Sequence, residues 1–265
     1  MTPHVVIVMT ALLLPATLQA QSVLLRFDPP DGAVLHRLFQ IHTRVLRAGG
    51  DSRESAELGG VREVTLRGRA DTPMLHLAYD SLRTRLREGT GPWREIAESN
   101  DSAWAQVRFD EQLEPTVVAS GGPGPAAARL VALVTGLPGL GLPRRPVRAG
   151  DRWTSRLEIP VPAMRPGAMI RQERLLVSEA VVSVDSVVAR ALDTLAYVSL
   201  RGTLVPAATG DQGYVGAVRG ALVWSTGWQA FVSGATRTRI ETRPENDQGG
   251  VLLETTVRQQ VRPGS

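Results

Sequence analysis

The chain has 265 residues, of which 43% are hydrophobic and 21% charged, the composition of a globular protein. It contains no cysteine, and all 30 basic residues are arginine, which excludes Schiff-base and Ser–Lys chemistry, thiol nucleophiles, disulfides and cysteine-ligated metals. The sequence pI of about 10.4 reflects a formal charge of only +4 in a chain with few groups that titrate between neutrality and pH 10. Because no basic run with interleaved aromatic residues occurs, we expect no nucleic-acid partner.

The N-terminus has the pattern of an export signal. A short apolar run from Val5 to Leu14 is followed by small residues that end at Ala20. We therefore predict a cleavable signal peptide over residues 1–20, with cleavage before Gln21, and a periplasmic or extracellular location. The alternative is a buried N-terminal strand or helix. No later apolar run approaches the roughly 18 residues of a membrane span, so we expect none after signal cleavage.

Short β-rich runs separated by Gly, Pro, Asn and Asp predict antiparallel hairpins from Pro29 onward. Residues 33–47 are ambiguous. Leu38, Ile41 and Val45 are spaced as on one face of a helix, but Phe39, Ile41 and Val45 alternate as on a strand. We predict a strand, because the neighbouring segments are β-rich.

Alternation with a period of two is clearest near the C-terminus, where Val251, Leu253 and Val257 lie opposite Glu254 and Arg258. Leu75, Leu77 and Tyr79 alternate in the same way with Met74, His76 and Asp80. Between residues 236 and 243 the alternation instead gathers charge on one face, which we interpret as a solvated face: Arg237, Arg239, Glu241 and Arg243.

One helix is predicted, over residues 125–137, between a Gly/Pro-rich break and a Gly–Leu–Pro–Gly terminator. The predicted fold class is mainly β: a curved antiparallel sheet or open half-barrel with this one central helix packed across it. We expect a single β-rich domain over residues 21–265. Two pseudo-repeated halves, residues 21–122 and 142–265, joined by the helix are the alternative within that domain.

The sequence carries no recognisable catalytic or metal motif. His36 and His42 would stand about 20 Å apart on one strand, and His76 has no ligand-spaced neighbour. No serine lies in a Gly-x-Ser-x-Gly elbow. We therefore predict no enzyme, no metal and no cofactor, although a hydrolase with an unrecognised site stays open because catalytic groups converge only in space.

The candidate ligand-lining residues are large apolar side chains. Leu130, Leu133 and Leu137 recur at helical spacing, and Trp224 and Trp228 lie close together near the end of a predicted strand. The functional hypothesis is that they line an apolar site between sheet and helix. The alternative is ordinary core packing.

Several short phrases resemble a loose set of uncharacterised, exported β-rich bacterial domains; these are Leu25–Phe27 with Pro30–Gly32, Pro143–Trp153, and Gly220–Trp224 followed by Gly227. A more distant similarity, in architecture only, is to periplasmic lipoprotein carriers, whose curved sheet closes around acyl chains. The family has no assigned activity, so no functional residue is carried over from it. From the chain as a whole we predict an exported, non-catalytic binding protein of the cell envelope that takes a lipid-like, apolar or amphipathic ligand. The competing hypothesis is an envelope module that binds another protein through a sheet face or edge.

Overall fold

The computed structural model describes residues 21–47, 49–67, 73–96, 102–122, 126–135, 140–162, 173–204, 213–243 and 250–264. The predicted signal peptide lies outside these residues. The described elements are β1 (Val34–Arg47), β2 (Ser52–Arg67), β3 (Pro73–Glu88), β4 (Arg94–Ile96), β5 (Trp104–Phe109), β6 (Pro115–Gly121), α1 (Ala126–Thr135), β7 (Arg152–Pro162), β8 (Glu173–Arg190), β9 (Asp193–Leu204), β10 (Gly213–Ser225), β11 (Ala230–Arg243) and β12 (Val251–Pro263).

The strands form one antiparallel sheet of 12 strands in the order β6-β5-β3-β2-β1-β12-β11-β10-β9-β8-β7, with β4 paired to β3. The first six strands step outward from the centre to one edge, and the last six step inward from the other edge. The two meanders meet where β1 pairs with β12. Because β6 and β7 are the ends of this order, the sheet is open, and the predicted fold class is confirmed. A duplication of the two halves stays a prediction.

The strand prediction for residues 33–47 is confirmed by β1, whose Leu35 and Phe39 are buried. The helix prediction is confirmed over Ala126–Thr135; residues 125, 136 and 137 lie outside the described part of the chain. In both segments the residue pattern matches the burial. Alternating apolar residues fit a half-buried strand, and an Ala/Leu-rich run after prolines fits a short helix.

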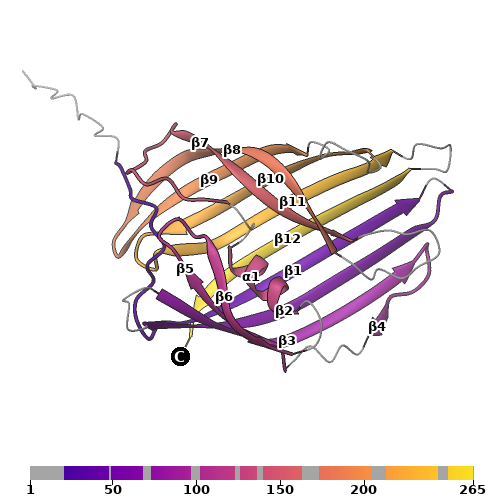
Figure 1. The fold of residues 1–265 in the computed structure, drawn as a ribbon, viewed down its shortest axis with the longest axis horizontal. Helices are drawn as coiled ribbons and strands as arrows, with labels where there is room; N and C mark the ends of the chain where they lie inside the picture. Colours follow the sequence, from indigo (N-terminus) through magenta and orange to yellow (C-terminus); the bar gives the residue numbers. More distant parts are fainter. Residues whose placement is uncertain are drawn as a thin grey trace, which may run out of the picture.

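The two edges of the sheet curl over the same side, and α1 lies between them (Figure 1). We call this side the inner face and the opposite side the outer face. Arg129 of α1 donates to Glu57 on the inner face of β2 at 3.2 Å, and α1 contributes Leu130 and Leu133 to the core. The inner face is closely packed. A Cβ added to Gly59 would lie 2.6 Å from the Phe39 ring, so glycine there allows the ring to lie on β2.

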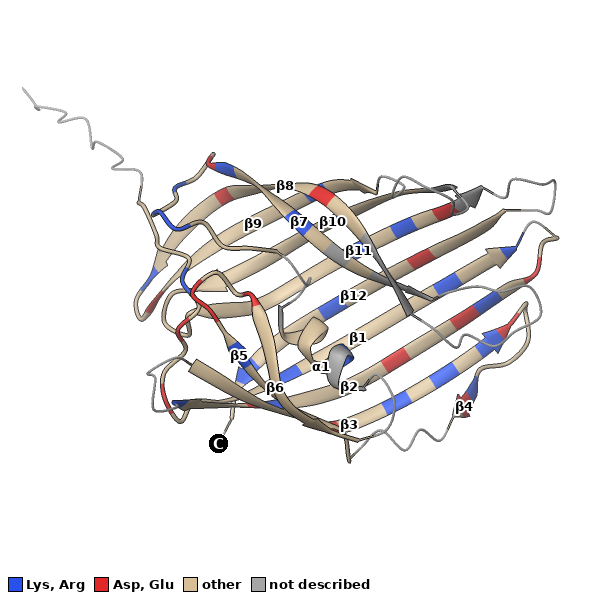
Figure 2. Cartoon of the chain, in the orientation of Figure 1, with Lys and Arg blue, Asp and Glu red and all other residues tan. Residues whose placement is uncertain are grey.

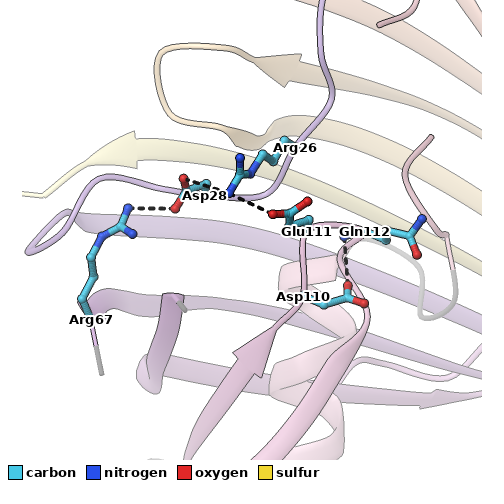
Figure 3. A network of polar contacts seen from close by, with 6 residues as sticks. All are labelled: Arg26, Asp28, Arg67, Asp110, Glu111 and Gln112. Atoms are coloured by element: carbon cyan, nitrogen blue, oxygen red, sulfur yellow. Dashed lines mark hydrogen bonds and ion pairs between the residues drawn. The ribbon is translucent and has the colours of Figure 1, made fainter. Parts of the chain in front are cut away.

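An extended arm, residues 21–29, crosses the end of the sheet and buries Leu25 and Phe27. Polar contacts hold the arm on both sides (Figure 3). Arg67 donates to Asp28 at 2.8 Å, and Arg26 forms an ion pair with Glu111 at 3.0 Å. These contacts attach the arm to the end of β2 and to the turn that follows β5.

A buried ion pair lies in the core where the two meanders meet. The guanidinium of Arg37 on β1 binds both carboxylate oxygens of Glu63 on β2, and it also donates to the backbone oxygen of Phe231 on β11 at 3.2 Å. Both side chains are almost completely buried. Such a pair is tolerated only when each charge is matched and hydrogen-bonded, as here.

Candidate functional site

The outer face carries a groove across the middle of the sheet. Its volume is about 560 Å³, within the usual range of small-molecule sites, and it crosses strands from both meanders. The register places its side chains in two neighbouring rows. Leu38 lies opposite Gln260 on β12, which lies opposite Ser233 on β11. One step along the strands, Leu58 on β2 lies opposite Gln40 on β1.

The floor of the groove is mainly apolar and accessible. Leu38 and Leu58 keep 41% and 60% of their surface exposed. The second meander contributes further apolar lining residues that are not buried: Tyr197, Ala221, Val223 and Ala235. The lining also includes the buried Phe39, Val198 and Leu222. An exposed apolar floor that runs across several strands can take up apolar surface from a ligand or partner.

Polar groups stand around this apolar floor. Arg258 and Gln260 line it from β12 and are exposed, while Asp185 on β8 accepts a hydrogen bond from Ser199 at 2.8 Å. The Arg258 guanidinium has no hydrogen bond or ion pair to any residue that the structure describes. The groove thus combines apolar surface with an available cation.

Of the residues that the sequence predicted to line a ligand site, three lie in the core. Leu130, Leu133 and Trp224 are 0%, 5% and 0% exposed and belong to one cluster of buried side chains. Trp228 lies half-buried in the turn between β10 and β11, and Leu137 lies outside the described residues. Their burial agrees with core packing, the alternative interpretation. A ligand-lining role for them stays a prediction.

The three histidines of the described residues are dispersed on the outer face. His36 Nδ1 lies 2.7 Å from Asp80 Oδ2, His42 Nε2 lies 3.3 Å from Glu54 Oε2, and the His76 ring lies near Trp104. Among the described residues no three His, Cys, Asp or Glu side chains are grouped as metal ligands. The His36–Asp80 pair resembles two members of a catalytic triad, but His36 has no hydrogen bond to a described serine hydroxyl.

The most connected polar cluster on this face surrounds Glu54, which is 9% exposed. Arg87 donates to it at 2.6 Å, His42 approaches at 3.3 Å and Arg44 at 3.6 Å, while the Arg87 guanidinium lies 4.8 Å from the centre of the Trp93 ring. Burial raises the pKa of Glu54, but the hydrogen bonds and charges of Arg87 and His42 outweigh this and hold the pKa below its ordinary value of 4.5.

The lowered pKa of Glu54 predicts a loss of stability in acid. A carboxyl whose pKa is lower in the folded state stabilises the fold fully above its unfolded pKa, and this contribution disappears as the pH falls through the folded value. Denaturant midpoints should therefore fall more steeply below pH 4.5 in the wild type than in Glu54→Gln. Parallel pH profiles for the two proteins would contradict this account.

The groove was not predicted from the sequence, although one feature of the residue pattern pointed to it. Leu38 is an apolar residue on the polar side of a strand whose other side already supplies Leu35 and Phe39 to the core. A leucine that breaks the alternation of a half-buried strand indicates an accessible apolar position. The same holds for Leu58 on β2. That they lie beside each other could not be predicted, because it depends on strand register.

A second hollow, of about 440 Å³, lies beside the N-terminal arm. The arm lines it together with Thr194, Thr226 and Gln229, and the surface of this hollow is more polar than that of the groove.

In the described ranges, no helix is both long and apolar enough to cross a membrane.

Comparison with models of known protein families, and with curated proteins, finds no match to this chain. The resemblance to exported β-rich domains therefore stays a prediction.

Proposed function

We propose that this chain is an exported, non-catalytic binding protein of the cell envelope that holds an apolar or amphipathic ligand in the groove on the outer face of its sheet. The observation that carries the proposal is the exposure of Leu38 and Leu58 on the floor of a hollow of about 560 Å³. Covering such leucines is favourable by about 25 cal/mol for each Å² of apolar surface removed from water. The export signal predicted over residues 1–20 supports the location.

A neutral apolar fluorophore such as N-phenyl-1-naphthylamine tests the proposal. Fluorescence titration of the mature protein should show saturable binding of one molecule per chain. The double variant Leu38→Gln/Leu58→Gln should bind about tenfold more weakly, because it removes accessible apolar surface from the floor. Both side chains are exposed, so the fold should not depend on them.

The matched control is Leu66→Gln. Leu66 lies on the same face of β2 and is 37% exposed, but it does not line the groove. Its variant should bind the fluorophore as the wild type does. Absence of saturable binding, or an equal loss in the control, would contradict the proposal. Binding that the groove variants leave unchanged would instead move the ligand to the helix side of the sheet.

The second candidate function is binding of another envelope protein through a sheet edge. One observation favours it: β6 is an edge strand, and its Val117 and Val118 are 48% and 49% exposed. An edge with accessible β-branched residues can pair with an added strand. The opposite edge is less suited to this, because Pro160 and Pro162 interrupt the amide donors of β7.

A further inference from the structure

A row of three arginines crosses the outer face next to the groove. Arg219 on β10 lies opposite Arg201 on β9 and opposite Arg237 on β11. Residues in such directly opposed positions have Cβ atoms about 4.5–5.5 Å apart, and like charges there destabilise a sheet. We call Arg201, Arg219 and Arg237 the arginine row. Figure 2 shows basic and acidic positions on neighbouring long strands of the sheet.

Only one member of the arginine row is paired. Arg237 donates to Glu254 on β12 at 3.1 Å. Arg201 and Arg219 are exposed, and neither has a hydrogen bond or ion pair to a described residue. Adjacent uncompensated cations break a local rule of sheet stability, and such departures are expected where a protein binds something. An anion placed between the guanidinium groups would relieve the repulsion.

The arginine row borders the groove. Ala221 lies two residues after Arg219 on β10, and Ala235 lies two residues before Arg237 on β11, so each alanine is on the same face as its arginine. Both alanines line the groove. Successive residues on one face of a strand are about 6.6 Å apart. Arg258, the unpaired cation of the groove wall, lies opposite Ala235. Cationic and apolar surfaces are therefore continuous over a distance that one small molecule can span.

We propose that the site binds a single anionic amphiphile, whose phosphate or carboxylate head lies on the arginine row and whose hydrocarbon chain lies in the groove. This inference rests on the proposed function and specifies the chemical class of its ligand. Guanidinium groups bind phosphate and carboxylate through paired N–H donors, and charge-assisted hydrogen bonds are about twice as strong as neutral ones.

A single molecule fits the geometry better than a membrane surface does. The groove is open and shallow, and its volume of about 560 Å³ matches one small molecule, whereas a bilayer surface attracts a basic patch through its surface charge and needs no hollow. An acidic protein would satisfy the charges but would leave the exposed leucines of the floor uncovered unless it carried apolar residues at the matching spacing. The amphiphile satisfies both surfaces at once.

The test is displacement of the neutral fluorophore by two ligands with the same chain, decyl phosphate and decanol, below their aggregation concentrations. In the wild type, decyl phosphate should displace the fluorophore at a concentration about tenfold or more below that of decanol. This preference should shrink as salt is added, because the arginine row is exposed and screened. A preference for decanol, or a preference for decyl phosphate that grows as salt is added, would contradict the inference.

Variants then locate the preference. Arg219→Gln should reduce the ratio between the two ligands to less than about twofold, and Arg219→Lys should restore part of it. The matched control, Arg62→Gln, removes one exposed cation from the same face outside the groove and should keep the full ratio. Arg219→Gln should also melt at a slightly higher temperature, since it relieves like-charge repulsion, so its loss of preference would not result from unfolding.

The outcomes separate the two proposals. If decanol and decyl phosphate bind equally well, the groove function stands and the anionic head site is wrong. If the fluorophore and both ligands fail to bind, the proposed function itself fails. Flotation with phosphatidylglycerol but not phosphatidylcholine vesicles, without a preference for monomeric decyl phosphate, would overturn the single-molecule site in favour of a membrane surface. Displacement by polyglutamate as strong as by decyl phosphate would overturn it in favour of an acidic partner.

Discussion

Replacing Glu63 with alanine should lower the free energy of unfolding by about 3–5 kcal/mol, because it leaves the buried Arg37 guanidinium without its carboxylate. The remaining hydrogen bond to the Phe231 backbone at 3.2 Å cannot neutralise that charge. Urea denaturation of the purified protein, analysed by linear extrapolation, measures the change. A loss below about 1 kcal/mol would show that water reaches the charge and that the pair is not isolated in the core.

The double variant Arg37→Met/Glu63→Leu is the informative comparison for this pair. Removing both charges and filling the space with apolar side chains avoids the uncompensated cation, and such replacements are often neutral or stabilising. We expect it to be more stable than Glu63→Ala by more than 2 kcal/mol. If the double variant were as unstable as the single one, packing rather than charge would explain the loss.

Trp224→Ala should destabilise the protein by about 3–5 kcal/mol, the usual cost of removing a large aromatic side chain from a packed core. The Trp224 ring is completely buried and lies edge-on to Phe231, with ring centres 5.0 Å apart. Its indole N–H has no hydrogen-bond partner among the described residues, so Trp224→Phe loses volume but no polar contact seen there and should cost clearly less than alanine.

Trp228→Ala is the matched control for Trp224. Trp228 is half-buried in the turn that follows β10, where its backbone N–H donates to Ser225 at 3.1 Å. We expect a loss of less than about 1.5 kcal/mol. Equal losses at the two positions would contradict the assignment of Trp224 to the core. A Trp228 variant that lost fluorophore binding while staying folded would support the ligand-lining role predicted from the sequence.

The proposed binding function explains why the outer face departs from an ordinary solvated surface. A sheet face of this kind normally alternates charge and small polar residues, as the positions around Glu241 and Glu254 do, where Arg239 and Arg237 are paired. Leu38, Leu58 and the unpaired cations Arg201 and Arg219 do not follow that pattern. The two leucines lie on β1 and β2 and the two arginines on β9 and β10, and the groove crosses β11 and β12 between them.

Little of the candidate site could be predicted from the sequence. The residues predicted to line a ligand site were large apolar ones, and two of them, Leu130 and Trp224, are buried in the core. Size and hydrophobicity identify residues that will be buried but do not distinguish a core from a ligand site. Leu38 and Leu58 were identifiable as apolar residues on polar strand faces, but neither indicates a site alone.

The sequence by itself determined much of the local structure. Alternation with a period of two specifies β3 and β12, the β-rich neighbours favour a strand at β1, and helical spacing bounded by proline and glycine specifies α1. The absence of lysine and cysteine excludes whole classes of chemistry. Only the tertiary structure decided which residues meet. Strand order and register bring positions that are distant in the sequence next to each other. They place the three arginines of the arginine row in line and bring Arg37 within reach of Glu63. Periodicity within one strand is the same for every partner and register that keeps the apolar side inward, so it carries no information about these neighbours.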